Sequence, residues 1–127
     1  MIPIETERLR LRELVDDDAG FIERLVNDPS WLKYIGDRHV HSRDDALRYI
    51  HDGPAASFAR HGFGLCHVSL REDGTAIGLC GLLQRDALAH PDIGFAYLPE
   101  FRGQGYASEA ARAMLGHARH VLRLPRV

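Results

Sequence analysis

The alternation of hydrophobic and polar residues is strictest over residues 6–14, where Leu9 and Leu11 fall on one face and arginines fall on the other. A period of two residues predicts a β-strand with one buried face. This strand should therefore lie on a hydrophobic core with its arginines in solvent.

Two apolar runs, residues 63–70 and 76–83, flank a Glu-Asp-Gly-Thr sequence at 72–75. Apolar runs on either side of a turn sequence predict a β-hairpin. A further run, residues 92–98, is apolar on both faces, which is typical of a strand with neighbours on either side, and Pro99 ends it.

Helical spacing of apolar residues appears first over residues 21–26. The aspartates at 16–18 supply caps and favourable charge at the start of this helix, and the Asn-Asp-Pro sequence at 27–29 ends it. Residues 30–41 contain aromatic side chains without a clear period, which predicts a short helix followed by a loop.

A second helical region begins at Ser42, because Asp45 follows three residues later in the arrangement of a capping box. The helix should run through Ile50. The Gly-Pro pair at 53–54 must break or kink it, since the proline ring clashes with the preceding turn. A following helix should end near Gly62.

The last predicted element is a long helix that begins near Gly105 and closes at Leu124 and Pro125. Its apolar face comprises Ala107, Ala110, Ala111, Met114, Ala118 and Val121. In order, the chain predicts a strand, two or three helices, three antiparallel strands and a long helix. This is one mixed domain of the α/β (α+β) class, over residues 1–127.

Composition excludes several classes of protein. The chain has 127 residues, with 16 Lys and Arg against 18 Asp and Glu, so it lacks the excess positive charge of a nucleic-acid-binding surface. No apolar run approaches the roughly 20 residues of a membrane helix. A charged N-terminus without an apolar core, and only two cysteines, predict a cytoplasmic location.

The segment at 92–109 combines features suited to binding an anion. A strand leads through a short loop into a helix, and Gly103 and Gly105 allow successive backbone N–H groups to point at one ligand. Glycines alone are also compatible with a tight turn that has no ligand. Arg102 and the positive end of the helix favour a phosphate or pyrophosphate site.

The sequence Arg-Gly-Gln-Gly-Tyr-Ala at 102–107 resembles the R/Q-x-x-G-x-G/A signature of the GNAT superfamily of acyl-CoA N-acyltransferases. The RimJ/RimL-type branch is the most similar, through ETERLRLRE at 5–13, NDP at 27–29, YIGDR at 34–38, HGFGL at 61–65 and DIGF at 92–95. The resemblance covers nearly the whole chain in order, and it implies a GNAT-type, mainly antiparallel sheet with flanking helices.

This resemblance implies acetyl-CoA as co-substrate and direct transfer of its acetyl group to a primary amine, either a protein N-terminus or a small amine, without a metal. The turn would bind the pyrophosphate, and the strand before it would pair with the pantetheine arm and polarise the thioester. The cofactor-binding residues so implied are Phe95, Ala96, Tyr97, Leu98, Arg102, Gly103, Gln104, Gly105, Tyr106 and Ala107.

Candidates for catalysis and acceptor binding each have a structural alternative. Asp92 either takes the proton of the amine, directly or through water, or is an exposed carboxylate at a strand end. Trp31 and Tyr34 either contact the acceptor or pack in the core. Arg85 either meets an acidic substrate or is solvated.

Other reactive residue types are assigned structural roles. Cys66 and Cys80 fall within apolar strands, so free buried thiols are expected rather than a disulfide or a nucleophile. Glu100 and Glu109 are expected as a loop surface group and a charge in the first helical turn. The histidine pairs at 39 and 41 and at 117 and 120 lack a third ligand, which argues against a zinc site.

Members of the GNAT superfamily continue beyond the signature helix with a strand, a helix and two strands. The domain is therefore expected to be incomplete at its C-terminal end, leaving an exposed sheet edge along residues 92–98 through which copies of the chain could self-associate. The alternative functions are a non-catalytic acyl-CoA-binding protein or an inactive fragment. A nucleotide-binding G-x-G-x-x-G site is disfavoured, because Ser108 replaces the third glycine.

Overall fold

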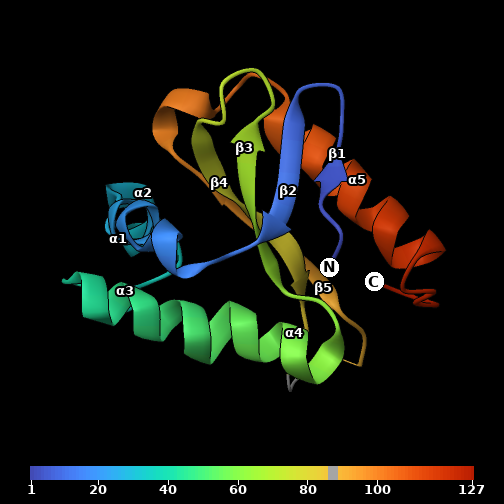
Figure 1. Cartoon of the computed structure of the whole chain (residues 1–127), viewed down its shortest axis with the longest axis horizontal. Helices are drawn as coiled ribbons and strands as arrows, with labels where there is room; N and C mark the ends of the chain where they lie inside the picture. Colours follow the sequence, from blue (N-terminus) through green and yellow to red (C-terminus); the bar gives the residue numbers. More distant parts are fainter. Residues whose placement is uncertain (86–88) are drawn as a thin grey trace.

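A five-stranded antiparallel sheet in the order β1-β2-β3-β4-β5 forms the centre of the computed structural model, which describes residues 1–85 and 89–127 (Figure 1). The strands are β1 (Ile4–Glu5), β2 (Leu9–Glu13), β3 (Leu65–Leu70), β4 (Ala76–Leu83) and β5 (Asp92–Tyr97). The mixed α/β class expected from the sequence is confirmed.

Strand pairing follows the hydrophobic pattern. Leu9 and Leu11 are fully buried on β2, as their alternation predicts. The predicted hairpin is β3 and β4, whose connection places Gly74 in the left-handed region at φ +77°. Gly81 of β4 lies so close to the backbone of Gly64 that a Cβ there would be 2.0 Å from the Gly64 carbonyl oxygen.

The apolar faces of β5 are typical of a strand with two neighbours, but an exposed sheet edge was expected along residues 92–98 because the domain ends early. Among the described strands it pairs with β4 alone, so it forms an edge of the sheet. Its two faces are nevertheless partly covered, which explains why both carry apolar residues.

Helices cover both faces of the sheet, with α5 on one side and α1 to α4 on the other (Figure 1). They are α1 (Ala19–Val26), α2 (Pro29–Tyr34), α3 (Arg43–Ile50), α4 (Ala56–His61) and α5 (Tyr106–His120). The cap predicted at Ser42 is present, since its side chain accepts from the Asp45 N–H at 3.1 Å. Of the caps predicted at residues 16–18, Asp18 directly precedes α1 but makes no side-chain capping hydrogen bond to it. Asp28, which was expected only to end α1, also caps α2 by accepting from the Ser30 N–H at 3.0 Å.

The sequence predicted that the Gly-Pro pair at 53–54 breaks or kinks the helical region, but the helical conformation continues through it. Residues 51–55 form a π-helical turn, and α3 and α4 form one continuous rod (Figure 1). The wider turn accommodates Pro54, which lacks a backbone N–H, without ending the helix. Gly62 ends α4 in the left-handed conformation, at φ +79°.

Each face of the sheet has its own hydrophobic core. Leu9, Leu11 and Met114 belong to the core beneath α5, whereas Ile22 and Leu25 belong to the core beneath α1, α2 and α3. Each fully buried leucine or isoleucine contributes about 1.5–3 kcal/mol.

The end of α5 corrects one prediction. Val121 was placed on the apolar face of the helix, but the helix ends at His120 and Val121 is 66% exposed. No helix among the described residues is both long enough and apolar enough to cross a bilayer.

A buried charged cluster fastens the start of α1 to the sheet. Arg12 donates two hydrogen bonds to the carboxylate of Asp18, at 2.8 and 2.9 Å, and His67 Nε2 lies 3.8 Å from the same carboxylate. Burial lowers the pKa of His67, and the Arg12 charge acts in the same direction. Burial also opposes the charged form of Asp18, but hydrogen bonds from Arg12 and Val15 outweigh it and lower the Asp18 pKa.

Candidate functional site

A cavity of about 490 Å³ opens between α2, β5 and the start of α5. Eight of the predicted cofactor residues line it: Phe95, Ala96, Tyr97, Arg102, Gly103, Gly105, Tyr106 and Ala107. Two others that the structure describes, Leu98 and Gln104, lie outside this lining. The segment singled out in the sequence therefore does form one wall of a cleft.

The turn between β5 and α5 has the backbone shape that its glycines permit. Gly103 and Gly105 both adopt left-handed conformations, with φ +75° and +83°. A Cβ at Gly103 would meet nothing within 4 Å, so the backbone there is open toward a ligand. Gly105 is also the N-cap of α5, which places the positive end of the helix at the cleft.

A clamp from the N-terminal strand holds this turn in place. Glu109, in the first turns of α5, accepts hydrogen bonds from Thr6 Oγ1 at 2.5 Å, the Arg8 backbone N–H at 2.9 Å and Arg8 Nε at 2.6 Å. Arg8 Nη1 donates to the Gln104 carbonyl at 3.0 Å, and its guanidinium lies 4.4 Å from the centre of the Tyr106 ring. We call Thr6, Arg8 and Glu109 the turn clamp.

Glu109 therefore does more than supply charge to a helix start, which was its expected role. Burial opposes ionisation of Glu109, but hydrogen bonds from Thr6 and Arg8 outweigh it and lower its pKa. Thr6 and Arg8 were missed as site residues, although both lie in the ETERLRLRE segment that carried the family resemblance. The resemblance of that segment to the RimJ/RimL-type branch was the signal that could have identified Thr6 and Arg8 as site residues.

Arg102 is held by protein groups on the rim of the cleft. Its Nε and Nη2 donate to the Tyr97 carbonyl at 3.1 and 2.8 Å, and Nη1 donates to Ser30 Oγ at 3.0 Å. Its Nη2 also lies 3.5 Å from the Asp28 carboxylate. Arg102 thus ties the start of α2 to the end of β5. Its role as a phosphate ligand stays a prediction.

The free edge of β5 faces the cleft with a defined set of backbone groups. The Leu98 N–H donates to the Ile77 carbonyl at 2.9 Å, toward β4. Because hydrogen-bonding direction alternates along an antiparallel strand, the N–H groups of Phe95 and Tyr97 point the other way, toward the free edge. The Tyr97 carbonyl on that edge is the one that Arg102 occupies.

A second cavity of about 700 Å³ adjoins the first and lies between the α3–α4 rod and the β4–β5 end of the sheet. Trp31, Ile35, Phe95 and Ala96 line both cavities, so the two meet beside the middle of β5. Of the predicted acceptor residues, Trp31 lines both cavities, Tyr34 lines the first and Arg85 lines the second.

Trp31 packs in the core, one of the two roles that the sequence left open, and its contact with the acceptor stays a prediction. Its side chain is buried in the core beneath α1 to α3 and also forms part of both cavity walls. Tyr34 is 76% exposed and so does not pack in the core.

Asp92 lies at the start of β5, opposite Leu83 of β4. Its carboxylate is 3.7 Å from Arg85 Nε, and the side chain is 44% exposed. Asp92 is not among the described residues that line either cavity. The structure therefore places it next to the second cavity through its partner Arg85, and its role as a base stays a prediction.

The two cysteines are free and buried, and they face each other across β3 and β4. Burial raises the pKa of both thiols to about 12. At neutral pH both are therefore protonated, which makes them poor nucleophiles.

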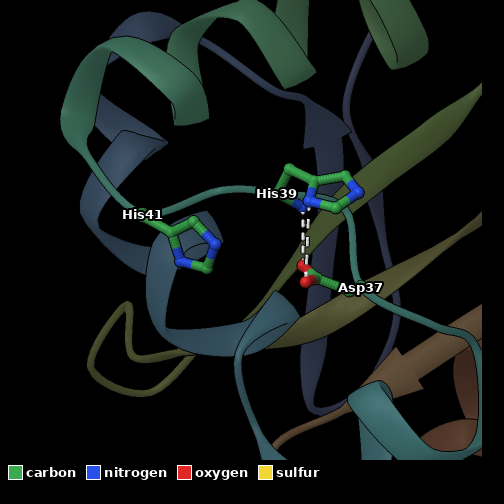
Figure 2. A group of neighbouring side chains, drawn as sticks. All are labelled: Asp37, His39 and His41. Carbon is green, nitrogen blue, oxygen red and sulfur yellow. Dashed lines mark hydrogen bonds and ion pairs between the residues drawn. The ribbon is translucent and has the colours of Figure 1, made fainter.

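The histidine pair at 39 and 41 has a third potential ligand that sequence reasoning missed. Asp37 lies beside it, and one ligand atom from each of the three residues falls within 4.8 Å of the others (Figure 2). The Asp37 carboxylate already accepts from the His39 backbone N–H at 2.7 Å, and all three residues are exposed. This local turn explains the arrangement without an ion.

Comparison with known proteins shows the family to which this fold belongs. A model of the Acetyltransferase (GNAT) domain family matches residues 8–127. The uncharacterized N-acetyltransferase YoaA of Bacillus subtilis (strain 168) is 29% identical over 130 residues, which cover 100% of this chain and 72% of that protein.

Solved structures show the same fold. An acetyltransferase from Agrobacterium tumefaciens str. C58 has a TM-score of 0.81 at 26% identity, covering 98% of this chain and 71% of that one. RimL, a ribosomal L7/L12 alpha-N-protein acetyltransferase solved with coenzyme A, has a TM-score of 0.75 at 18% identity, covering 91% and 67%.

Proposed function

Because this chain belongs to the GNAT acetyltransferase family, we propose that it transfers the acetyl group of acetyl-CoA directly to a primary amine in a ternary complex. One observation carries the proposal. The turn at 102–107 combines two left-handed glycines with the N-terminus of α5, and it opens on a cleft that runs along the free edge of β5.

The cofactor would lie along this cleft. Backbone N–H groups at the turn would bind the pyrophosphate, and the guanidinium of Arg102 would add positive charge at the rim. The Phe95 and Tyr97 N–H groups would hydrogen-bond the pantetheine arm and the thioester carbonyl. The structure of RimL with coenzyme A supports this cofactor class through a shared fold.

The chemical step needs no covalent intermediate on the protein. The neutral amine nitrogen attacks the thioester carbon, a β5 N–H stabilises the developing oxyanion, and the carbon–sulfur bond then breaks to release the CoA thiolate. The amine loses its proton to Asp92, directly or through water. Protonated, buried Cys66 and Cys80 support transfer without an acyl-cysteine.

The acceptor would enter through the second cavity, whose junction with the first lies at Trp31 and Phe95. Either a protein N-terminus or a small amine fits this arrangement. The activity named for RimL supports a protein N-terminus.

Two free thiols suit a cytoplasmic protein. Self-association through the β5 edge stays a prediction.

Calorimetric titration with acetyl-CoA tests the cofactor site. In Gly105→Val, the side chain would be strained at φ +83° and crowd Arg8 Nη2, which lies 3.3 Å from the Cβ position. Gly74→Val is the matched control, because Gly74 has a similar φ of +77° but lies in the β3–β4 turn. We expect only Gly105→Val to lose acetyl-CoA binding. Unchanged binding in that variant would overturn the site.

The alternative function is a protein that binds acyl-CoA without turnover. Assay of a panel of amines distinguishes the two, because the alternative requires that acetyl-CoA binds while no amine becomes acetylated.

A further inference from the structure

The second cavity carries more positive charge than the chain as a whole. Arg38, Arg60 and Arg85 line it, and Asp52 is the one carboxylate among the described residues of its lining. The whole chain, in contrast, has a formal net charge of −2. The three arginines come from separate segments: the loop after α2, helix α4 and the residues after β4. Their convergence on one cavity is therefore a product of the fold.

Two of these guanidinium groups have no acidic partner within residues 1–85 and 89–127. Arg85 is 3.7 Å from Asp92, whereas neither Arg38 nor Arg60 forms an ion pair there. A guanidinium presents a planar fork of donors that fits a carboxylate. Both groups are thus available to an anion in the cavity.

The walls of the cavity strengthen the effect of these charges. Leu65, Leu79, Leu83 and Ile93 form part of its lining. Apolar walls focus the field of nearby charges, which raises the local concentration of ligands with the opposite sign.

These arginines are not placed to bind the cofactor phosphates. Arg85 lies beside Asp92 at the start of β5, while the glycine turn follows the end of that strand. The strand from Asp92 to Tyr97 spans roughly 17 Å at about 3.3 Å per residue. None of the three arginines lines the first cavity.

We infer that the second cavity selects amines that carry a carboxylate near the reacting nitrogen, with Arg38 and Arg60 as specificity-determining residues. This inference rests on the proposed acetyl transfer for the identity of the cavity as the acceptor site. The positive field also disfavours the ammonium form of the acceptor, because like charges repel. The same residues therefore attract the acceptor and favour its neutral, nucleophilic amine.

The test compares acceptors that differ only in a carboxylate. One pair consists of two peptides that begin Ser-Glu and Ser-Gln and are otherwise identical. A second pair, phenylalanine and phenethylamine, distinguishes a small amino acid from a peptide as the source of the carboxylate. Binding is measured by calorimetry in the presence of CoA, separately from turnover with acetyl-CoA.

For at least one pair, we expect the acidic member to bind about tenfold more tightly, as a charge-assisted pair with arginine allows. In the double variant Arg38→Gln, Arg60→Gln this preference should disappear, while affinity for acetyl-CoA stays at the native value. Arg112→Gln, which removes an exposed arginine from α5, is the control and should keep the preference.

Equal binding within both pairs would overturn the inference, and so would a preference that survives in the double variant. Preferential binding of the acidic member without acetylation would support the charge selectivity and contradict the proposed function. The failure of one proposal is thus distinguishable from the failure of the other.

Discussion

Substituting Glu109→Gln removes the carboxylate of the turn clamp with little change in side-chain size. Glu109 accepts from Thr6 Oγ1 and from both the backbone N–H and the guanidinium of Arg8. A neutral amide retains one oxygen but loses the charge that strengthens these contacts. The glycine turn should then sample conformations in which its N–H groups no longer converge on a phosphate.

The expected magnitude follows from the two contacts that do not involve the Arg8 guanidinium. The Glu109 side chain is 18% exposed, and its hydrogen bonds from Thr6 and the Arg8 N–H together stabilise the clamp by about 1–2 kcal/mol. The contact with the Arg8 guanidinium is screened by solvent and is left out of this figure. A loss of this size weakens acetyl-CoA binding by about 5- to 30-fold.

The assay compares two acetyl donors. Acetyl-CoA carries the pyrophosphate, whereas S-acetylpantetheine carries the same thioester without it. We expect Glu109→Gln to raise the KM for acetyl-CoA and to leave kcat/KM for S-acetylpantetheine at the native value. A general loss of folding would lower activity with both donors.

Glu100→Gln is the matched control, because it removes the same charge from the segment just before the glycine turn. Glu100 is exposed, and among the described residues only its backbone carbonyl is in a hydrogen bond, with Gln104. If removal of negative charge acts only by relieving repulsion of the phosphates, both variants should bind acetyl-CoA more tightly. Tighter binding by Glu109→Gln would therefore refute the clamp.

Three further outcomes are expected. Gly81→Ala should lower the free energy of unfolding by about 3 kcal/mol in urea denaturation, because its Cβ would overlap the Gly64 carbonyl; a negligible loss would contradict the packing. Acidification below about pH 6.5 should progressively lower the free energy of unfolding, because His67 has a lower pKa in the folded chain and therefore binds a proton more readily when the chain is unfolded. The lowered pKa of Asp18 should continue this loss of stability at more acidic pH. Unfolding measured across pH in His67→Gln should show a shallower dependence near neutrality, and an unchanged slope would exclude His67 as its source. Asp92→Asn should reduce kcat by roughly 10²–10⁴ while acetyl-CoA affinity stays native; full activity would remove Asp92 as the base.

Local patterns were sufficient to predict most elements of this fold. The hairpin, the helix start at Ser42 and the glycine turn each depend on residues close together in sequence. Where a local rule admitted two outcomes, the prediction was less successful. The Gly-Pro pair at 53–54 was expected to break or kink a helix, but a π-helical turn lets the chain continue through it.

Contacts between distant residues were not accessible in the same way. Arg8 and Glu109 are 101 residues apart, and nothing in either segment identifies the other as its partner. The hydrogen bonds of Arg102 to Ser30 and the Tyr97 carbonyl were likewise not predicted. The choice of partner for a charged side chain depends on which elements the fold brings together, so it required the structure.

Initial-rate kinetics with acetyl-CoA and an amine varied together test the central claim most directly. Direct transfer from acetyl-CoA bound along β5 predicts intersecting double-reciprocal lines and one acetyl group on the amine of each product molecule. Parallel lines would indicate an acetylated enzyme intermediate and contradict direct transfer. Bound acetyl-CoA with no acetylated amine would contradict the proposed activity itself.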